Sequence, residues 1–236
     1  MSGAEPAQKL TDRCLAKLKQ RCRVLLLLDA AERVGIAPLS SPRLHGFAYL
    51  ADVLSPVWDL VPFEGKVYKS EGGPHYPDLQ DELDSLVVLG LVQASDLRYG
   101  ATPHGGARIS GSYGLSFESD HLEAIFAALG AGAPEDAIDP EDCRLHAFLV
   151  ELAGALATLP DDEIESAAGV DVTYRAEKRL HNIVDFAQWA EDRREANPTW
   201  RAADRFQSFL PQHARMMPGE KLYLYAAYLG RAMHAR

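Results

Sequence analysis

One stretch between residues 72 and 92 constrains the fold of this chain more than any other. It opens with two glycines and two prolines, which keep residues 72–77 out of a helix, and Pro77 fixes the backbone angle φ at a value that suits a helical first turn. Apolar residues then recur at the spacing of one helical face: Leu79, Leu83, Leu86 and Val87. Gly90 ends this pattern, and an extended Leu-Val pair follows. The stretch therefore predicts a loop, a short helix and the start of a strand.

The order of elements around this helix is typical of a winged helix-turn-helix domain. Helical patterns at residues 8–34 and 41–54 precede it, and strand patterns at 91–94 and 107–115 follow it, as the wing of such a domain would. Beyond about residue 130 the pattern is helical alone. We therefore predict a mainly α (α+β) chain, with an N-terminal winged helix-turn-helix, a small β-wing and a C-terminal helical domain.

The charge on the predicted third helix favours contact with a protein over recognition of DNA. A helix that reads DNA normally presents Arg, Lys, Asn or Gln to phosphates and base edges. Residues 78–89 contain four acids and no base, and only Gln80 could read a base edge. Phosphates would repel these carboxylates in a major groove. We expect this region to bind a partner protein through Tyr76, Asp78, Asp81 and Glu82.

Length and composition narrow the class of protein. The 236 residues suffice for one large domain or two small ones. No run approaches the roughly 20 apolar residues of a membrane span, and the N-terminus lacks the pattern of a signal peptide. The three cysteines, Cys14, Cys22 and Cys143, lack CxxC spacing and fit a reducing compartment. We expect a cytoplasmic protein with no membrane contact, no metal and no cofactor.

The basic residues leave two interpretations open. A net charge of -10 argues against general coating of nucleic acid, although a local patch can still touch DNA. The first half of the helix predicted at 8–34 is rich in Lys and Arg, and we favour a solvated helix face over a contact with DNA or an acidic partner. The candidate DNA contacts, on this helix and on the wing, are Lys17, Lys19, Arg21, Arg23, Arg98 and Arg108.

An aromatic insertion separates the second and third predicted helices. A winged helix usually joins these helices by a tight turn, whereas residues 56–77 form a longer segment here. It contains Trp58, Phe63 and Tyr68, which would either cover the edge of the core or form a docking surface for a partner. We count these three residues among the candidate partner contacts.

A segment rich in Gly, Ala, Pro and acids at 130–139 predicts a domain boundary. We therefore expect two domains, at residues 1–130 and 131–236. The helices predicted in the second part are Pro140–Leu159, Asp161–Ala168, Tyr174–Ala196, Thr199–Leu210 and Gly219–His234. The last of these is unusually aromatic, and Tyr223 and Tyr225 are candidate partner contacts if that face is exposed.

The sequence contains none of the common catalytic motifs. GxSxG, HExxH, a Walker motif and an HxE with a paired CxxC are all absent, and the eight histidines are scattered. The acids at 161–163 and 78–84 could bind a divalent ion if the fold brought them together, but their spacing does not distinguish them from an ordinary acidic surface. We predict no catalytic residues and no enzymatic activity.

Four segments stand out when they are taken together: Arg23-Val24-Leu25-Leu26-Leu27-Leu28-Asp29-Ala30-Ala31-Glu32, Arg43-Leu44-His45-Gly46-Phe47-Ala48-Tyr49-Leu50, Pro56-Val57-Trp58-Asp59 and Gly72-Gly73-Pro74-His75-Tyr76-Pro77. As a group they resemble the middle components of ABC-three-component systems, the accessory subunits of Lamassu-type bacterial anti-phage defence. The resemblance covers roughly residues 20–120 and implies two partners, an SMC-like ABC ATPase and an effector that is often a nuclease. It implies a non-catalytic adaptor that joins them, with a weak DNA contact inside the complex left open.

Two other functions compete with the adaptor. The chain would be a DNA-binding transcriptional regulator, or an antitoxin-like protein, if the wing and the basic first helix contacted one DNA sequence far more tightly than bulk DNA. It would be an enzyme of an unrecognised type if a pocket gathered several titratable groups. The sequence favours the adaptor because of the acidic third helix.

Overall fold

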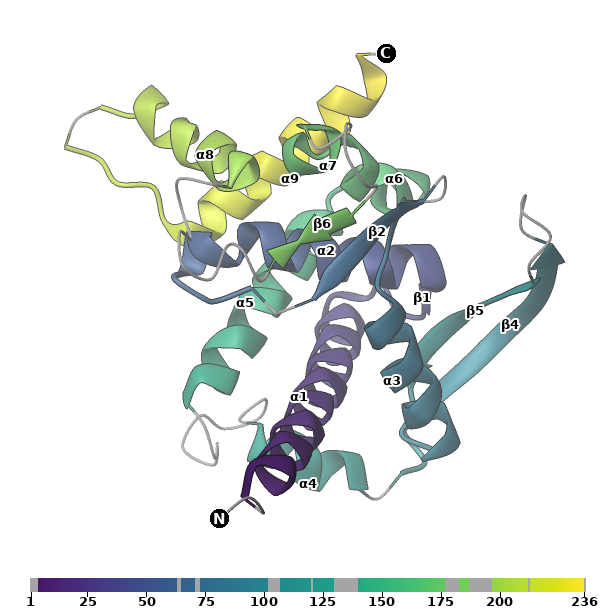
Figure 1. The fold of residues 1–236 in the computed structure, drawn as a ribbon. Coiled ribbons are helices and arrows are strands. Elements are labelled where there is room, and N and C mark those ends of the chain that lie inside the picture. The colour runs from purple at the N-terminus through teal and green to yellow at the C-terminus, as the bar shows by residue number, and fades with distance from the viewer. Residues whose placement is uncertain are drawn as a thin grey trace.

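The computed structural model describes residues 4–62, 65–70, 73–101, 107–119, 121–129, 140–176, 183–186, 197–211 and 213–235. Within these ranges the protein is mostly helical, with two small antiparallel sheets (Figure 1). The helices are α1 (Ala4–Val34), α2 (Ser41–Leu54), α3 (Pro77–Val88), α4 (His121–Ala128), α5 (Pro140–Leu156), α6 (Asp161–Val170), α7 (Val172–Ala176), α8 (Pro198–Asp204) and α9 (Pro218–His234). Two 3₁₀ helices are η1 (Ser55–Trp58) and η4 (Arg205–Phe209). The strands are β1 (Leu39–Ser40), β2 (Lys66–Ser70), β3 (Gly73–His75), β4 (Val92–Ala101), β5 (Ala107–Leu115) and β6 (Ile183–Asp185).

The two sheets join segments that are far apart in the chain. The first has the strand order β1-β5-β4, with Leu39 opposite Tyr113 and Val92 opposite Leu115. The second has the order β3-β2-β6, and in it Val67 lies opposite Val184. The pairing of β2 with β6 connects the aromatic insertion to the C-terminal part of the chain.

Local signals in the sequence set the ends of α2 and α3. The side chain of Ser40 accepts a hydrogen bond from the backbone N–H of Arg43, so Ser40 caps α2. Pro77 begins α3, as predicted. Gly90 has φ of 71°, a left-handed conformation that glycine adopts without strain, and this confirms that it turns the chain out of α3.

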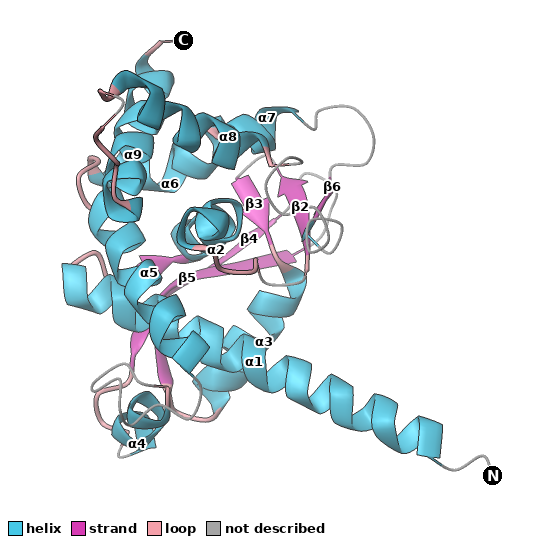
Figure 2. Ribbon diagram, turned by 90° about the vertical axis from the view of Figure 1, so that its left-hand side faces the viewer, coloured by secondary structure: helices cyan, strands magenta, loops and turns pink. Residues whose placement is uncertain are grey.

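The core is built around the apolar half of α1. Residues 24–28 of α1 are all buried, as their unbroken apolar run predicts, and they are part of one continuous cluster with residues of α2, α3 and α5. Figure 2 views α2 almost end-on, between α6 and α9 on one side and α1 on the other. Every residue of α2 from Leu44 to Leu54 is buried, so α2 is the central helix of the molecule.

The two parts of the chain that the sequence separates at residue 130 share this core. α5 packs against α1, and α6 packs against α2. Leu149 and Leu152 of α5 belong to the same buried cluster as Leu25 of α1. The chain therefore changes composition near residue 130 without a corresponding break in the core.

Two expectations about secondary structure need correction. Of the helix predicted at Tyr174–Ala196, residues 174–176 belong to α7, residues 183–185 form β6 because they pair with β2, and residues 177–182 and 187–196 lie outside the described ranges. The strand predicted at 91–94 extends as β4 to Ala101. Within the described ranges no single helix has the length and hydropathy of a membrane span; α5 and α6 reach that composition only as a pair, bent by 113°.

Candidate functional site

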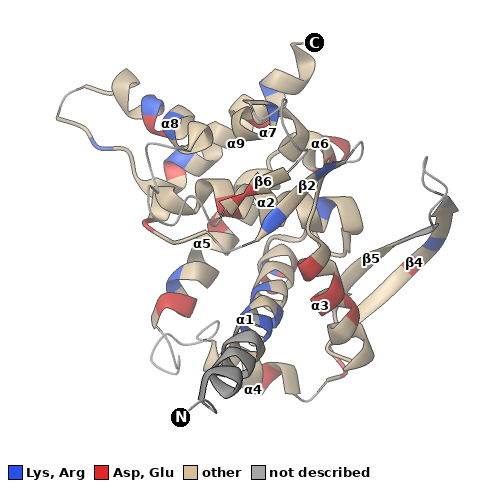
Figure 3. Cartoon of the chain, viewed as in Figure 1, with Lys and Arg blue, Asp and Glu red and all other residues tan. Residues whose placement is uncertain are grey.

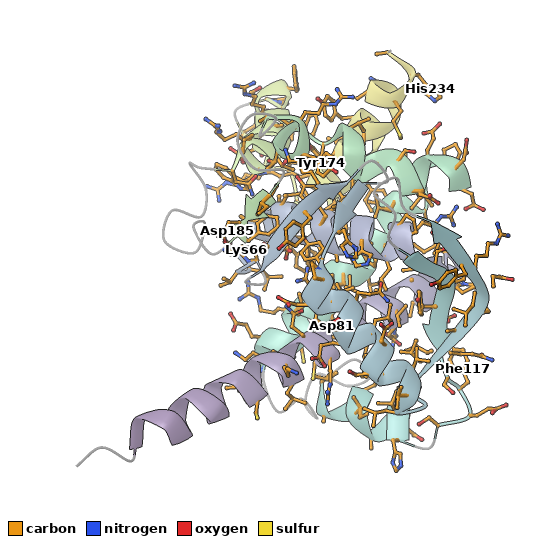
Figure 4. All side chains as sticks on the ribbon, turned by 45° about the vertical axis from the view of Figure 1, so that its right-hand side comes forward. Lys66, Asp81, Phe117, Tyr174, Asp185 and His234 are labelled. Atoms are coloured by element: carbon orange, nitrogen blue, oxygen red, sulfur yellow. The ribbon has the colours of Figure 1, made fainter. Side chains whose placement is uncertain are left out.

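The outward face of α3 is a row of carboxylates. Leu79, Leu83 and Leu86 point into the core, which turns Asp78, Asp81 and Asp84 to the solvent. Figure 3 shows these acids along α3, and Figure 4 shows Asp81 on its exposed side. The side chain of Gln80, the single candidate for reading a base edge, donates to Asp84 Oδ1 at 2.8 Å and lies 3.1 Å from His45 Nε2. The face that would meet DNA in a reading helix is therefore anionic.

This acidic face ends in exposed apolar residues. Val88 is 87% exposed and Leu89 is 58% exposed. Both line a shallow depression of about 400 Å³ together with Arg21, Asp84 and Ser85, between α3 and α1. We call Asp78, Asp81, Asp84, Val88 and Leu89 the α3 surface. Its mixture of carboxylates and exposed apolar side chains suits a polypeptide with basic and apolar groups.

Glu82 lies on the other side of α3 and is buried. Its side chain accepts from Arg21 Nε at 2.6 Å, and Lys17 Nζ lies 3.9 Å from it. These contacts fasten α3 to α1. The expectation that Glu82 contacts a partner is therefore not kept, because its carboxylate is occupied inside the chain and is only 5% exposed.

Tyr76 is a core residue, which also corrects its assignment as a partner contact. Its hydroxyl donates to Asp52 Oδ2 at 2.7 Å, and its backbone N–H donates to His45 Nδ1 at 3.2 Å. Burial, followed by the negative charge of Asp52, raises the pKa of Tyr76 well above its usual value, so the hydroxyl keeps its proton. Because Nδ1 of His45 accepts, Nε2 holds the ring hydrogen that faces Gln80.

The basic residues that the sequence offers for DNA contact differ in burial and in ion pairing. Arg23 is 2% exposed and pairs with Asp52 at 2.8 Å, so it stabilises the core and cannot reach DNA. Lys17 and Arg21 face Glu82, as described above. Lys19 and Arg98 are exposed. Arg108 lies on β5 opposite Gly100, and its side chain is outside the described part of the structure.

The aromatic residues of the insertion also differ in their exposure to solvent. Trp58 is half-buried and packs on Phe148 of α5, with ring centroids 6.0 Å apart, so it covers the edge of the core. Tyr68 is exposed and lines a depression of about 340 Å³ with Lys66, Asp78 and Asp185. Figure 4 shows Lys66 beside Asp185, and these side chains are 3.9 Å apart. Phe63 lies outside the described residues.

Tyr225, a candidate partner contact, is fully buried in a polar network that the sequence did not reveal. Its hydroxyl donates to Asp171 Oδ1 at 2.6 Å, and Thr199 donates to the same oxygen at 2.7 Å. Asp171 Oδ2 accepts from Tyr49 Oη at 2.8 Å and from the backbone N–H of Tyr174 at 3.0 Å. Burial and the charge of Asp171 raise the pKa of Tyr225. Tyr223 remains accessible, at 42% exposure.

A second buried cluster joins α1 to α5. Asp29 Oδ2 lies 2.6 Å from His146 Nε2 and 2.6 Å from Arg33 Nε. The spacing of Asp29 and Arg33, four residues apart on a helix, predicts their pairing, whereas nothing local indicates His146. Both buried clusters therefore depend on contacts between distant parts of the chain.

The described side chains do not assemble a metal site. Across the described ranges, no three residues among His, Cys, Asp and Glu are grouped so that they could hold a metal ion. Comparison of the chain with protein-family models, with curated proteins and with solved structures finds no match.

Proposed function

We propose that this protein is a non-catalytic adaptor that joins an SMC-like ABC ATPase to an effector subunit in a bacterial anti-phage defence complex of the Lamassu type. The proposal rests on the resemblance of residues 20–120 to the middle components of such systems. The observation that supports it most directly is the α3 surface, which combines three exposed carboxylates with exposed apolar side chains. Such a surface suits a protein partner and repels phosphate.

The proposal includes a winged helix-turn-helix for residues 4–129. In its support, α1, β1, α2, α3, β4 and β5 follow one another in that order, and their sheet has the order β1-β5-β4. In this interpretation β4 and β5 are the wing and α3 is the third helix. η1, β2 and β3 are then an insertion between the second and third helices.

An adaptor needs two separate contact surfaces, and the projecting half of α1 is a candidate for the second. Figure 2 shows the N-terminal end of α1 extending away from the body of the protein. Leu15 and Leu18 are exposed there, three residues apart on the helix, and Lys17 and Lys19 lie beside them. Apolar residues flanked by bases suit an amphipathic helix with acidic edges.

The regulator hypothesis loses support from the positions of the basic residues. A regulator would present several basic side chains on or beside α3, yet Arg23 is buried and Arg21 is paired with Glu82. The exposed side of α3 adds carboxylates at the place where phosphates would lie. We therefore retain the adaptor as the proposed function.

Co-expression tests this proposal. The protein should co-purify with an SMC-like ATPase and an effector encoded by adjacent genes, and the three should elute together in size-exclusion chromatography. Charge reversal on α3 (Asp81→Lys with Asp84→Lys) should release one partner, and Leu15→Glu with Leu18→Glu should release the other. A chain that elutes alone after co-expression with each neighbouring gene product would refute the adaptor proposal.

A further inference from the structure

The last part of the chain has the opposite charge to the rest. Residues 197–236 contain six Lys and Arg but only two Asp and Glu, a net charge of +4, whereas residues 1–196 have a net charge of -14. Such a division of charge within one chain indicates a local surface for an anionic partner despite the acidic total.

Both acidic side chains of this part, Asp204 and Glu220, accept hydrogen bonds from groups within the protein. Asp204 Oδ1 accepts from Lys221 Nζ at 2.7 Å, and Glu220 Oε2 accepts from the backbone N–H of Met217 at 2.7 Å, which caps α9. Arg201, Arg205 and Arg215 are exposed and have no carboxylate partner in the part of the chain that the structure describes. Their positive charges are therefore available to a ligand.

These arginines lie on one protruding arm, formed by α8, η4 and the described residues 210–211 and 213–217. Thr199 and Ala203 face the core, which leaves Arg201 and Arg205 on the exposed side of the arm. The arm projects at one corner of the molecule, away from β4 and β5 (Figure 1). Figure 3 shows its basic residues on α8.

Gln207 holds Arg215 against the same arm. Its Nε2 donates to the carbonyl oxygen of Ala214 at 2.8 Å, and its Oε1 accepts from the backbone N–H of Met216 at 2.9 Å. These two hydrogen bonds bracket Arg215 and fix its backbone beside η4. The backbone on both sides of Arg215 is therefore fixed to η4, the segment that carries Arg205.

An exposed aromatic ring belongs to the same basic arm. Phe209, the last residue of η4, is 81% exposed. Its ring offers a flat apolar face on which a planar group can stack. A single-stranded nucleic acid supplies at each nucleotide a phosphate for an arginine and a flat base for an aromatic ring. An acidic peptide would satisfy the arginines and leave the ring without a comparable partner.

We propose that this arm, formed by α8, η4 and residues 210–211 and 213–217, binds single-stranded nucleic acid. Arg201, Arg205 and Arg215 contact successive phosphates, and Phe209 stacks on an unpaired base. This surface does not include α3, so the inference stands apart from the adaptor proposal. It also differs from the wing and the first helix, where the sequence indicated the candidate DNA contacts.

The test uses the full-length protein and a fluorescent oligodeoxythymidine, with binding measured by anisotropy over a range of salt concentrations. The variant Arg201→Glu with Arg205→Glu should weaken binding by at least about tenfold, because two phosphate contacts become repulsive. The slope of log K against log salt should fall by about 1.4, since each lost contact with a single strand removes about 0.7. The matched control is Arg144→Glu with Arg231→Glu, which changes the net charge equally at exposed positions on α5 and α9 and should leave binding nearly unchanged.

Two further measurements separate the chemical alternatives. Phe209→Ala, which removes an exposed side chain and should leave the fold intact, should weaken binding of the single strand more than binding of a duplex. Polyglutamate should compete poorly with the oligonucleotide. Equal losses in the arm variant and the control, an arm variant that binds like the unchanged protein, or polyglutamate that competes as well as the oligonucleotide would overturn the inference. Co-purification with partners is a separate measurement, so a failure here leaves the adaptor proposal to its own test.

Discussion

Asp171 joins four helices through a single side chain. Its carboxylate accepts from Tyr49 on α2, Thr199 on α8, Tyr225 on α9 and the backbone of Tyr174 on α7. A buried carboxylate is tolerated because each oxygen receives two hydrogen bonds, which replace its lost hydration. This residue therefore fixes how the C-terminal helices dock on the central helix α2.

Replacing Asp171 with Asn should destabilise the protein by about 1–3 kcal/mol. The amide turns one oxygen into a donor, which then faces two other donors. Urea unfolding monitored by circular dichroism measures the change, and Asp81→Asn on the exposed face of α3 is the matched control, expected to stay within about 0.5 kcal/mol. A loss no larger than that of the control would show that the network does not hold the helices together.

We expect the contribution of Asp29 to the stability of the protein to depend on pH. Burial alone would raise the pKa of Asp29, but the hydrogen bonds and charges of His146 and Arg33 outweigh burial and lower it. A pKa lowered by folding adds stability above the unfolded pKa of about 3.9, and this stability is lost as the pH falls through the folded value. The variant Asp29→Asn should therefore be less stable than the unchanged protein at pH 7, and the difference should shrink below about pH 4. Urea unfolding at a series of pH values checks this; a difference that persists in acid would contradict it.

Among the secondary-structure elements, helix α3 can be predicted from the local sequence, whereas the pairing of strands distant in the chain cannot. Pro77 and Gly90 bound α3 in the sequence, and the helix forms between them as predicted. β6 was missed because residues 183–185 have a helical pattern around them and become a strand only by pairing with β2, more than a hundred residues earlier. The spacing of apolar residues indicates the local preference of the chain for helix or strand. It carries no information about a distant strand such as β2.

The turn after α3 gives a prediction at this scale. Gly90 has φ of 71°, and a Cβ there would meet nothing within 4 Å, so the cost of a side chain comes from the backbone alone. Gly90→Ala should destabilise the protein by about 1 kcal/mol. Gly169, on α6, has equally open surroundings without a positive φ, so Gly169→Ala should be neutral or stabilising by up to about 1 kcal/mol. Thermal unfolding of both variants tests the contrast, and shifts in the same direction would refute it.

The described residues share one core, although the sequence suggests two parts. Composition changes at residues 130–139, but the apolar run of α1 is covered by α5, from beyond that segment. A linker can be recognised from Gly, Pro and charge, whereas the faces that meet after it depend on packing. The sequence therefore marks this segment as a change in composition and does not reveal the shared core.

A shared core predicts a single unfolding transition. Circular dichroism, which reports on all helices, and fluorescence of Trp58 and Trp200, which belong to the two sequence parts, should give coincident urea curves. A fragment of residues 1–130 should fail to form a stable fold, because it leaves the buried face of α1 without α5. Separate transitions, or a cooperatively folded fragment, would show two independent domains.

The candidate surfaces were partly predictable from residue type and spacing. Asp78 and Asp81 lie on the exposed side of α3 because the leucines of that helix define its inward face. Glu82 and Tyr76 could not be separated from them by sequence, since their burial depends on Arg21 of α1 and Asp52 of α2. The arm at residues 197–217 is visible in the sequence as a change in the sign of the charge. Its geometry depends on the hydrogen bonds of Gln207.

The central claim is that the exposed carboxylates of α3 bind a protein. Its most direct test is the affinity of the purified protein for its co-expressed partners, compared between Asp81→Lys with Asp84→Lys and the matched control Asp162→Lys with Glu165→Lys, which makes the same charge change at the same spacing on α6. We predict that the α3 variant loses a partner while the α6 variant retains it, with both variants folded by circular dichroism. Equal retention by the two variants, or an α3 variant that binds its partners as tightly as the unchanged protein, would contradict the account.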